Sequence, residues 1–303
     1  MPDVRNAVPP PDGSVDAGVA WHYGDPLGEQ RRLDDGEGWV DLTHRPVLQV
    51  AGDDRLAWLH TLTSQHLSEL PTGVWTQALV LSPHGHVEHH LTLVDDGHVV
   101  LAHVEPGTAE SLVAYLESMK FWSKVDVSLR DDAGVVWRPG PSGMDGDDRY
   151  EFVDRASLDN SAGDAAGTWA FEALRVAAAR PRLGFETDHR TIPAEVGWID
   201  VAVHLDKGCY RGQETVARVH NLGQPPRRLV RLHLDGSADA LPERGADLTY
   251  EGRKVGFVGT VAQHYELGPV ALGLLKRQIA DGTALQTDAG PVTAETPSLS
   301  VAG

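Results

Sequence analysis

The chain has 303 residues, of which 41% are hydrophobic, so it can bury a substantial core and is neither a disordered nor a fibrous protein. This length suits two or three domains better than one. Acidic residues outnumber basic ones by 44 to 26, and the formal net charge of −18 argues against nucleic acid binding over the whole surface.

No apolar run in the sequence is long enough to span a membrane, and the first residues lack the apolar stretch of a secretory signal. We therefore expect a cytoplasmic protein with no membrane partner. Residues 1–18 contain Pro9, Pro10, Pro11 and little apolar material, which predicts a flexible leader that takes no part in the fold.

The segment 46–119 has the pattern of an antiparallel sheet with helices. An apolar run at 46–50 predicts a strand, and Asp53 is the expected N-cap of the helix that follows it. Further strands are predicted over 75–81, 87–93 and 99–104, with a tight turn at Asp96-Gly97 before the last. Apolar residues at helical spacing after Thr108 predict an amphipathic helix across this sheet.

Turn-forming and acidic residues over 140–148 predict a loop, and their spacing does not match a calcium-binding loop. A helix should begin at Thr168 and end near Arg180, because Pro181 cannot continue it. Short alternating strands over 229–234, 254–261 and 270–275 then predict a small β-barrel. The expected organisation is a leader at 1–18, a main module at 19–224 and a barrel at 225–303.

The charge balance reverses locally between Arg175 and Arg231. This segment has ten Lys or Arg and six Asp or Glu, a net of +4 in a chain of net −18. Such a segment is either a solvated basic surface or a site for an anionic ligand.

Cys209 is the only cysteine, so one chain can form neither a disulfide nor a cluster site that needs several thiolates. Gly208 and Gly212 flank it and leave the thiol unshielded, while Lys207 and Arg211 are close enough in sequence to favour thiolate. The residues alone leave open whether Cys209 is reactive or a buried, inert thiol.

The run Lys-Gly-Cys-Tyr-Arg-Gly-Gln-Glu at 207–214, followed by Ala217 and Arg218, resembles the signature of YgfZ-type folate-binding proteins. These belong to the aminomethyltransferase-like superfamily of the glycine-cleavage T protein. Segments 180–184, 191–195 and 227–230 extend the likeness. The matching motif residues besides the cysteine are Lys207, Gly208, Tyr210, Gly212, Gln213, Glu214 and Arg218.

This resemblance implies an α+β fold with interleaved sheet-and-helix subdomains followed by a C-terminal β-barrel. It also implies a site for tetrahydrofolate or a one-carbon derivative. Glu195 would accept hydrogen bonds from the pterin ring, and Arg182, Arg227 and Arg228 are the candidates for the carboxylate tail, since a guanidinium matches a carboxylate in shape and charge. Cys209 would lie near the folate.

The role that the resemblance implies is assistance in assembling or repairing iron-sulfur clusters in client proteins, with effects on tRNA modification in some relatives and no direct nucleic acid contact expected. The alternative is a folate-dependent aminomethyl transferase. T proteins carry an acidic pair on a strand that corresponds to residues 85–91, and histidines occupy the acidic positions in this chain. Transferase activity is therefore doubtful, unless a register shift of one residue brings Glu88 into that position.

Two other hypotheses find less support. His86, Glu88 and His90 share one face of a strand, but residues four apart in a strand are separated by about 13 Å, too far to hold one metal ion alone. We therefore predict no metal site. A Cys/His hydrolase is permitted by composition, yet nothing in the sequence positions a histidine beside Cys209.

Overall fold

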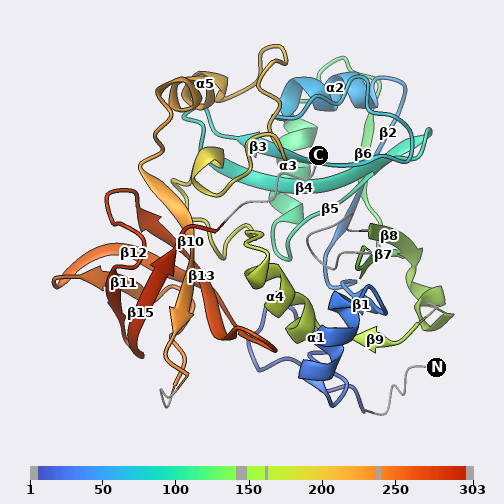
Figure 1. The fold of residues 1–303 in the computed structure, drawn as a ribbon. Coiled ribbons are helices and arrows are strands. Elements are labelled where there is room, and N and C mark those ends of the chain that lie inside the picture. Colours follow the sequence, from blue (N-terminus) through green and yellow to red (C-terminus); the bar gives the residue numbers. More distant parts are fainter. Residues whose placement is uncertain (1–5, 141–148, 161–162, 237–239, 298–303) are drawn as a thin grey trace.

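The computed structural model describes residues 6–140, 149–160, 163–236 and 240–297. They form a five-stranded sheet of order β3-β4-β5-β2-β6, a four-stranded sheet of order β8-β7-β1-β9, and a closed barrel of order β10-β13-β12-β11-β14-β15 (Figure 1). The α+β fold expected from the resemblance, with a barrel at its C-terminal end, is confirmed. In the described ranges, no helix is long and apolar enough to cross a membrane.

The five-stranded sheet is antiparallel throughout. Leu91 and Leu93 point to one face, where helices α2 and α3 cover them, and His90 and Thr92 point to the other, which faces a cavity. Because side chains alternate between the two faces, one face of the sheet packs in the core and the other forms a wall of the cavity. The elements are β2 (Val47–Ala51), α2 (Arg55–Leu62), β3 (Trp75–Leu81), β4 (Val87–Asp95), β5 (Val99–His103), α3 (Ala109–Ser118) and β6 (Asp126–Leu129).

The four-stranded sheet takes its strands from both sides of the first sheet in sequence, which interleaves the two subdomains. Helices α1 and α4 pack against it through Leu33, Phe171 and Leu174, with Trp137 fully buried between them. Its elements are α1 (Pro26–Asp34), β1 (Trp39–Asp41), β7 (Ala133–Arg138), β8 (Arg149–Asp154), the 3₁₀ helix η2 (Arg155–Asn160), β9 (Ala165–Ala166) and α4 (Thr168–Ala177).

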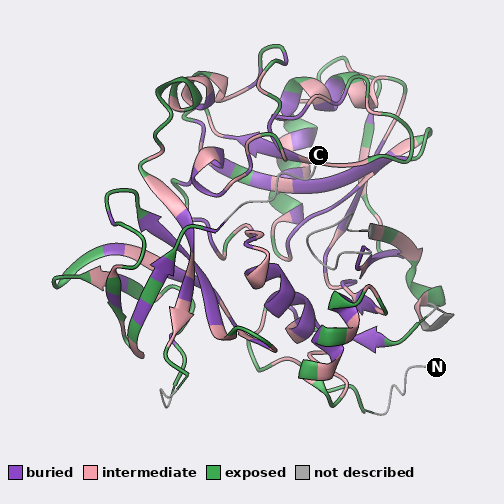
Figure 2. Cartoon of the chain, viewed as in Figure 1, coloured by how far each residue is buried: buried purple, intermediate pink, exposed green. Residues whose placement is uncertain are grey.

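The barrel follows two short helices and has its own apolar core, which includes Val230, Leu232 and Val258. Figure 2 shows this buried interior beside the buried helix α4, whose Ala173 and Val176 pack against the barrel. The elements are η3 (Pro193–Glu195), α5 (Gln213–Leu222), β10 (Arg227–Leu234), β11 (Asp247–Tyr250), β12 (Arg253–His264), β13 (Gly268–Lys276), β14 (Ala284–Thr287) and β15 (Gly290–Glu295).

Two local expectations need correction. The predicted leader does not hold for residues 6–18, because Asp16 is buried and its carboxylate lies 2.9 Å from Arg182 and 3.0 Å from His44. Burial alone would raise the pKa of Asp16, but the hydrogen bond from His44 and the charge of Arg182 bring it below its ordinary range. The N-cap of α2 is Asp54 rather than Asp53. The acidic loop, apart from Gly140, lies outside the described residues.

Gly212, a residue of the 207–214 motif, joins that motif to the five-stranded sheet. It precedes α5 with φ of +82°, and a Cβ atom there would lie 2.6 Å from the Ser82 carbonyl oxygen and 2.9 Å from the Cα of Gly85. Both contacts are with the backbone of the β3–β4 turn, which cannot move aside easily. Only glycine fits this position, so packing explains why the motif has a glycine at residue 212.

We expect Gly212→Ala to lower the free energy of unfolding by about 2 kcal/mol or more, because it adds left-handed strain to a backbone clash. Gly208→Ala is the matched control, since a Cβ there meets nothing within 4 Å and should change stability by less than about 0.5 kcal/mol. Urea unfolding measures both. Equal stability of the two variants would contradict this role for Gly212.

Candidate functional site

A cavity of about 750 Å³ lies on the uncovered face of the five-stranded sheet. Its walls come from β3, β4 and β5, the segment 178–182 after α4, the segment 194–201 and the C-terminal end of α5. The volume is that of a typical small-molecule site. Chain segments far apart in sequence therefore converge on one cavity.

Flat rings make up much of the cavity wall. Trp198 and His90 have ring centroids 4.6 Å apart at an angle of 31°. Trp75 is half-buried and stacks on Phe152 at 5.0 Å, while Tyr150 lies 4.7 Å from His103. Trp75, His90, His103, Tyr150 and Trp198 all line the cavity, which favours a planar ligand.

Two of the histidines that line the cavity, His90 and His103, are neutral at neutral pH. Burial lowers the pKa of His90 to about 4, and Nε2 of its ring lies 2.8 Å from Oε1 of Gln77, which fixes the orientation of the ring. Burial, together with the charge of Arg45, holds the pKa of His103 well below its ordinary value. Neither ring carries a charge that would attract an anion.

Glu105 supplies a fixed negative charge to the same cavity. Its Oε2 accepts hydrogen bonds from Nη2 of Arg182 at 2.7 Å and from Nε at 3.1 Å, and its Oε1 lies 3.6 Å from Arg45. Burial alone would raise its pKa, but the charges of Arg182 and Arg45 lower it to about 2. Glu105 is therefore an ionised hydrogen-bond acceptor at neutral pH.

The fold and this site can be compared with known proteins. Residues 227–300 match the family model described as the CAF17 C-terminal beta-barrel domain. The glycine cleavage system aminomethyltransferase T from Bartonella henselae superposes with a TM-score of 0.77 at 19% identity, over 97% of this chain and 94% of that one. At that identity the likeness establishes the fold.

Two curated relatives agree with the structural match. A protein of Arabidopsis thaliana, provisionally named a chloroplastic transferase, is 26% identical over 324 residues, which cover 88% of this chain and 72% of the relative. The aminomethyltransferase of Bacillus subtilis is 24% identical over 83% of each chain. The chain is thus similar in sequence to an aminomethyltransferase over most of its length, and its barrel is similar to the CAF17 C-terminal domain.

Of the folate contacts that the family resemblance implied, only Arg182 lines the cavity. Its guanidinium is held by Glu105, by Asp16 at 2.9 Å and by Glu172 at 3.0 Å. Burial works against the charge, but these acids raise the pKa of Arg182 well above its ordinary value. Three carboxylates already engage this side chain, so it positions the wall of the cavity.

Glu195 lies outside the set of cavity-lining residues, and its carboxylate is occupied. Arg227 donates to both of its oxygens at 2.8 Å, and the backbone N–H of Ile192 donates to Oε2 at 3.1 Å. Arg227 also contacts Asp188 at 2.6 Å. This geometry gives no support to the pterin contact predicted for Glu195. The ion pair between Glu195 and Arg227 instead joins η3 to the start of the barrel.

Arg228 is likewise engaged within the barrel, where it donates to the Ile279 carbonyl at 2.6 Å and to Asp281 at 2.9 Å. The arginines proposed to bind a folate tail are thus paired with this chain's own acids. The excess of positive charge between residues 175 and 231 is therefore partly neutralised by acids outside that segment, such as Glu105 and Asp281.

The motif residues form a loop beside the cavity. Lys207 is buried, and its ammonium donates to the carbonyls of His60, Thr63 and Gln65, so it caps the C-terminal end of α2. Burial lowers its pKa to about 8, which leaves it mostly charged at neutral pH. Tyr210 packs in the apolar cluster that contains Trp198.

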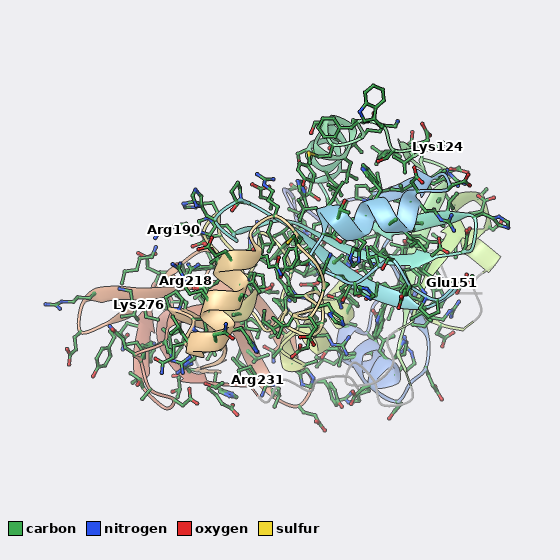
Figure 3. All side chains as sticks on the ribbon, turned by 90° about the horizontal axis from the view of Figure 1, so that it is seen from above. Lys124, Glu151, Arg190, Arg218, Arg231 and Lys276 are labelled. Carbon is green, nitrogen blue, oxygen red and sulfur yellow. The ribbon has the colours of Figure 1, made fainter. Side chains whose placement is uncertain are left out.

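The remaining motif residues lie on or beside α5. Gln213 and Glu214 form its first turn, and Arg218 is exposed on it. Figure 3 shows Arg218 projecting from this helix. Cys209 is exposed and lies outside the cavity lining, so the expected proximity of its thiol to a folate is not supported by this geometry.

Sequence reasoning missed Trp75, Gln77, Glu105 and Trp198 as site residues. Each lies in a segment that was read as a strand or a loop, and no local pattern marks them. The alternation of β4 was the one available signal, since His90 faces opposite to Leu91. Among the described residues, no group of three or more His, Cys, Asp or Glu is arranged to hold a metal ion.

Glu105→Gln should lower the free energy of unfolding at pH 7 by about 3 kcal/mol, because it removes the buried negative charge that pairs with Arg182 and Arg45. The pKa of Glu105 falls from 4.5 to about 2 on folding, so its charge contributes fully above pH 4.5, and that contribution is lost as the pH falls toward 2. The difference in the free energy of unfolding between wild type and Glu105→Gln should therefore become smaller as the pH falls. Urea unfolding at several pH values measures it.

Glu243→Gln is the control for this series, because Glu243 is exposed. It should match wild type at every pH within about 0.5 kcal/mol. A gap for Glu105→Gln that widened between pH 4.5 and 2 would contradict the ionised state assigned to this carboxylate.

Proposed function

We propose that this protein binds tetrahydrofolate or a one-carbon derivative in the cavity and acts as an accessory protein for iron-sulfur enzymes. The observation that carries the proposal is a cavity of about 750 Å³ with planar aromatic walls and the ionised carboxylate of Glu105 in its lining. It occurs in a fold whose solved relative is named an aminomethyltransferase.

The cavity residues fit a pterin. Trp75 and Trp198 offer flat apolar surfaces, and Glu105 can accept hydrogen bonds from adjacent pterin N–H groups while it keeps its arginine partners. Gln77 and Thr92 add polar groups on the sheet side. Arg180, half-buried at the wall, is the guanidinium there that we assign to the carboxylate tail. In this arrangement Glu105 takes the role first expected for Glu195.

The chemistry of the cavity favours binding over aminomethyl transfer. Glu105, with a pKa of about 2, is a weak base at neutral pH, and His90, with a pKa of about 4, is also a weak one. The strand that resembles the acid-bearing strand of T proteins contributes the neutral ring of His90 to the cavity wall. A one-carbon transferase needs a better-matched proton acceptor beside the folate nitrogens.

Cys209 acts, in this proposal, on a partner outside the cavity. Its thiol is exposed, and it lies three residues before Gly212, where α5 begins. The other end of α5 contributes Val219 and His220 to the cavity wall. A ligand that contacts this wall would therefore also stabilise the helix next to the thiol, which couples the folate site to the reactive residue.

Calorimetric titration with tetrahydrofolate should give saturable binding to the wild type. Trp75→Ala should weaken it at least tenfold by removing a stacking surface, and Glu105→Gln should weaken it by removing the acceptor. Glu195→Gln should bind within about twofold of wild type. Trp122→Ala is the control, because this tryptophan is 98% exposed and lies outside the cavity lining.

If Glu195→Gln lost binding and Glu105→Gln kept it, the pterin contact would be made by Glu195 and not by Glu105. Absence of saturable binding by the wild type would contradict the folate proposal itself.

Cys209→Ala should bind tetrahydrofolate like the wild type and keep its stability within about 0.5 kcal/mol, since the side chain is exposed. In cells that lack the native protein, it should fail to restore the activity of iron-sulfur enzymes. Full restoration would contradict a role for the thiol. Release of a one-carbon folate product from an aminomethyl donor by the purified wild type would instead favour the transferase.

A further inference from the structure

Arg45 and Glu105 form an ion pair in the cavity wall that leaves hydrogen-bonding capacity on both sides. Both residues line the cavity, and Arg45 is only 4% exposed. Nη2 of Arg45 lies 3.6 Å from Oε1 of Glu105, which is close enough for an ion pair and too far for a hydrogen bond. Nε of Arg45 is also buried without a hydrogen-bond partner among the described residues. The guanidinium therefore has donors to spare.

The two oxygens of Glu105 differ in the same way. Oε2 accepts two hydrogen bonds from Arg182, at 2.7 and 3.1 Å, whereas the nearest cation to Oε1 in the described part of the chain is Arg45 at 3.6 Å. Buried polar groups are normally paired, so a donor and an acceptor left side by side indicate a place for a group from outside the chain. A ligand that makes both hydrogen bonds can replace water there without loss.

This pair lies beside the aromatic rings of the cavity. Burial raises the pKa of Tyr150, and the charge and hydrogen bond of Arg45 oppose that rise. Burial lowers the pKa of His90 and of His103, and the charge of Arg45 lowers both further. The ring of Tyr150 in turn lies 5.8 Å from the ring of Trp75. The rim of a planar ligand that stacks on these rings can therefore reach Arg45.

The ligand group that fits this pair is neutral. In the ion-pair network around it, carboxylates already outnumber guanidiniums, so no excess of positive charge is left for a carboxylate or a phosphate. The carboxylates are Asp16, Glu105, Glu172 and Glu186, and the guanidiniums are Arg45, Arg175 and Arg182. An N–H beside a C=O satisfies both members of the pair at once, because the N–H donates to Glu105 and the C=O accepts from Arg45. In a planar ring, this is the edge of a lactam.

We propose that Arg45 determines which ring edge the cavity accepts: a lactam whose carbonyl oxygen accepts from Arg45 while the adjacent ring N–H donates to Oε1 of Glu105. This inference rests on the proposed function, because both residues line the folate site, and it adds the edge by which the ring is recognised. A 4-oxo pterin has such an edge. A 4-amino ring presents a donor to Arg45 and a lone pair to Glu105, so it matches neither group.

The test uses two small rings without a tail, quinazolin-4(3H)-one and 4-aminoquinazoline, which differ only at this edge. Ligand-observed NMR titrations give the dissociation constant of each ring for the wild-type protein. We expect the quinazolinone to bind at least about tenfold more tightly, because a site with a buried donor and a buried acceptor rejects a ring that pairs with neither.

Arg45→Met should abolish this preference, leaving the two rings within about threefold of each other, since it removes the guanidinium donors and keeps a long side chain. Arg253→Met is the matched control, because Arg253 is exposed at the start of β12 and lies outside the cavity lining. It should keep the wild-type preference. The comparison of the two rings with wild-type protein needs no variant, so it decides the proposal even where Arg45→Met does not fold.

Equal affinity of the two rings for the wild type, or no saturable binding of the quinazolinone, would overturn the proposal, as would a preference that Arg45→Met leaves unchanged. Titration with tetrahydrofolate tests the proposed function separately. Tetrahydrofolate binding without a preference between the rings would contradict the lactam contact and keep the folate site. A lactam preference without tetrahydrofolate binding would contradict the folate site and keep the role of Arg45.

Discussion

The arrangement of this protein depends on a buried network of ionised side chains centred on Arg182. Its guanidinium joins Asp16 near the N-terminus, Glu105 after β5 and Glu172 on α4. Glu172 in turn binds Arg175 at 2.7 Å, and Arg175 reaches Glu186, whose other oxygen accepts from the backbone of Thr260 in the barrel. One connected network thus links both subdomains and the barrel.

Buried charges are costly to desolvate, so such a network contributes less to net stability than to geometry. Each carboxylate has a guanidinium partner, and a displaced segment would leave a charge buried and unpaired. The cavity borders this network on one side and neutral rings on the other. Glu105 lines this cavity, and its position is fixed by Arg182, the same arginine that connects the domains.

The sequence predicted the elements that have local causes. Strands β2, β3, β4 and β5 of the five-stranded sheet, strands β10, β12 and β13 of the barrel and the end of α4 before Pro181 follow from alternation, turn residues and proline geometry. Strands β6, β11, β14 and β15 were not predicted. The flexible leader was a wrong prediction for residues 6–18, because Asp16 is buried in an ion pair with Arg182, 166 residues away in sequence. A segment of low apolar content can still be ordered when a residue distant in sequence binds it. The local sequence around Asp16 does not reveal that Arg182 is such a residue.

The site was harder to predict for the same reason. Charge counting over 175–231 gave an excess of positive charge, but Arg182 and Arg228 find their acids outside that segment, in Glu105 and Asp281. The family motif located the loop correctly, although most of its residues serve packing. Lys207 caps a helix, Tyr210 fills an apolar cluster and Gly212 permits a backbone contact. Cys209 is left exposed among residues that hold the loop in place, so the sequence motif marks a thiol that is accessible from solvent.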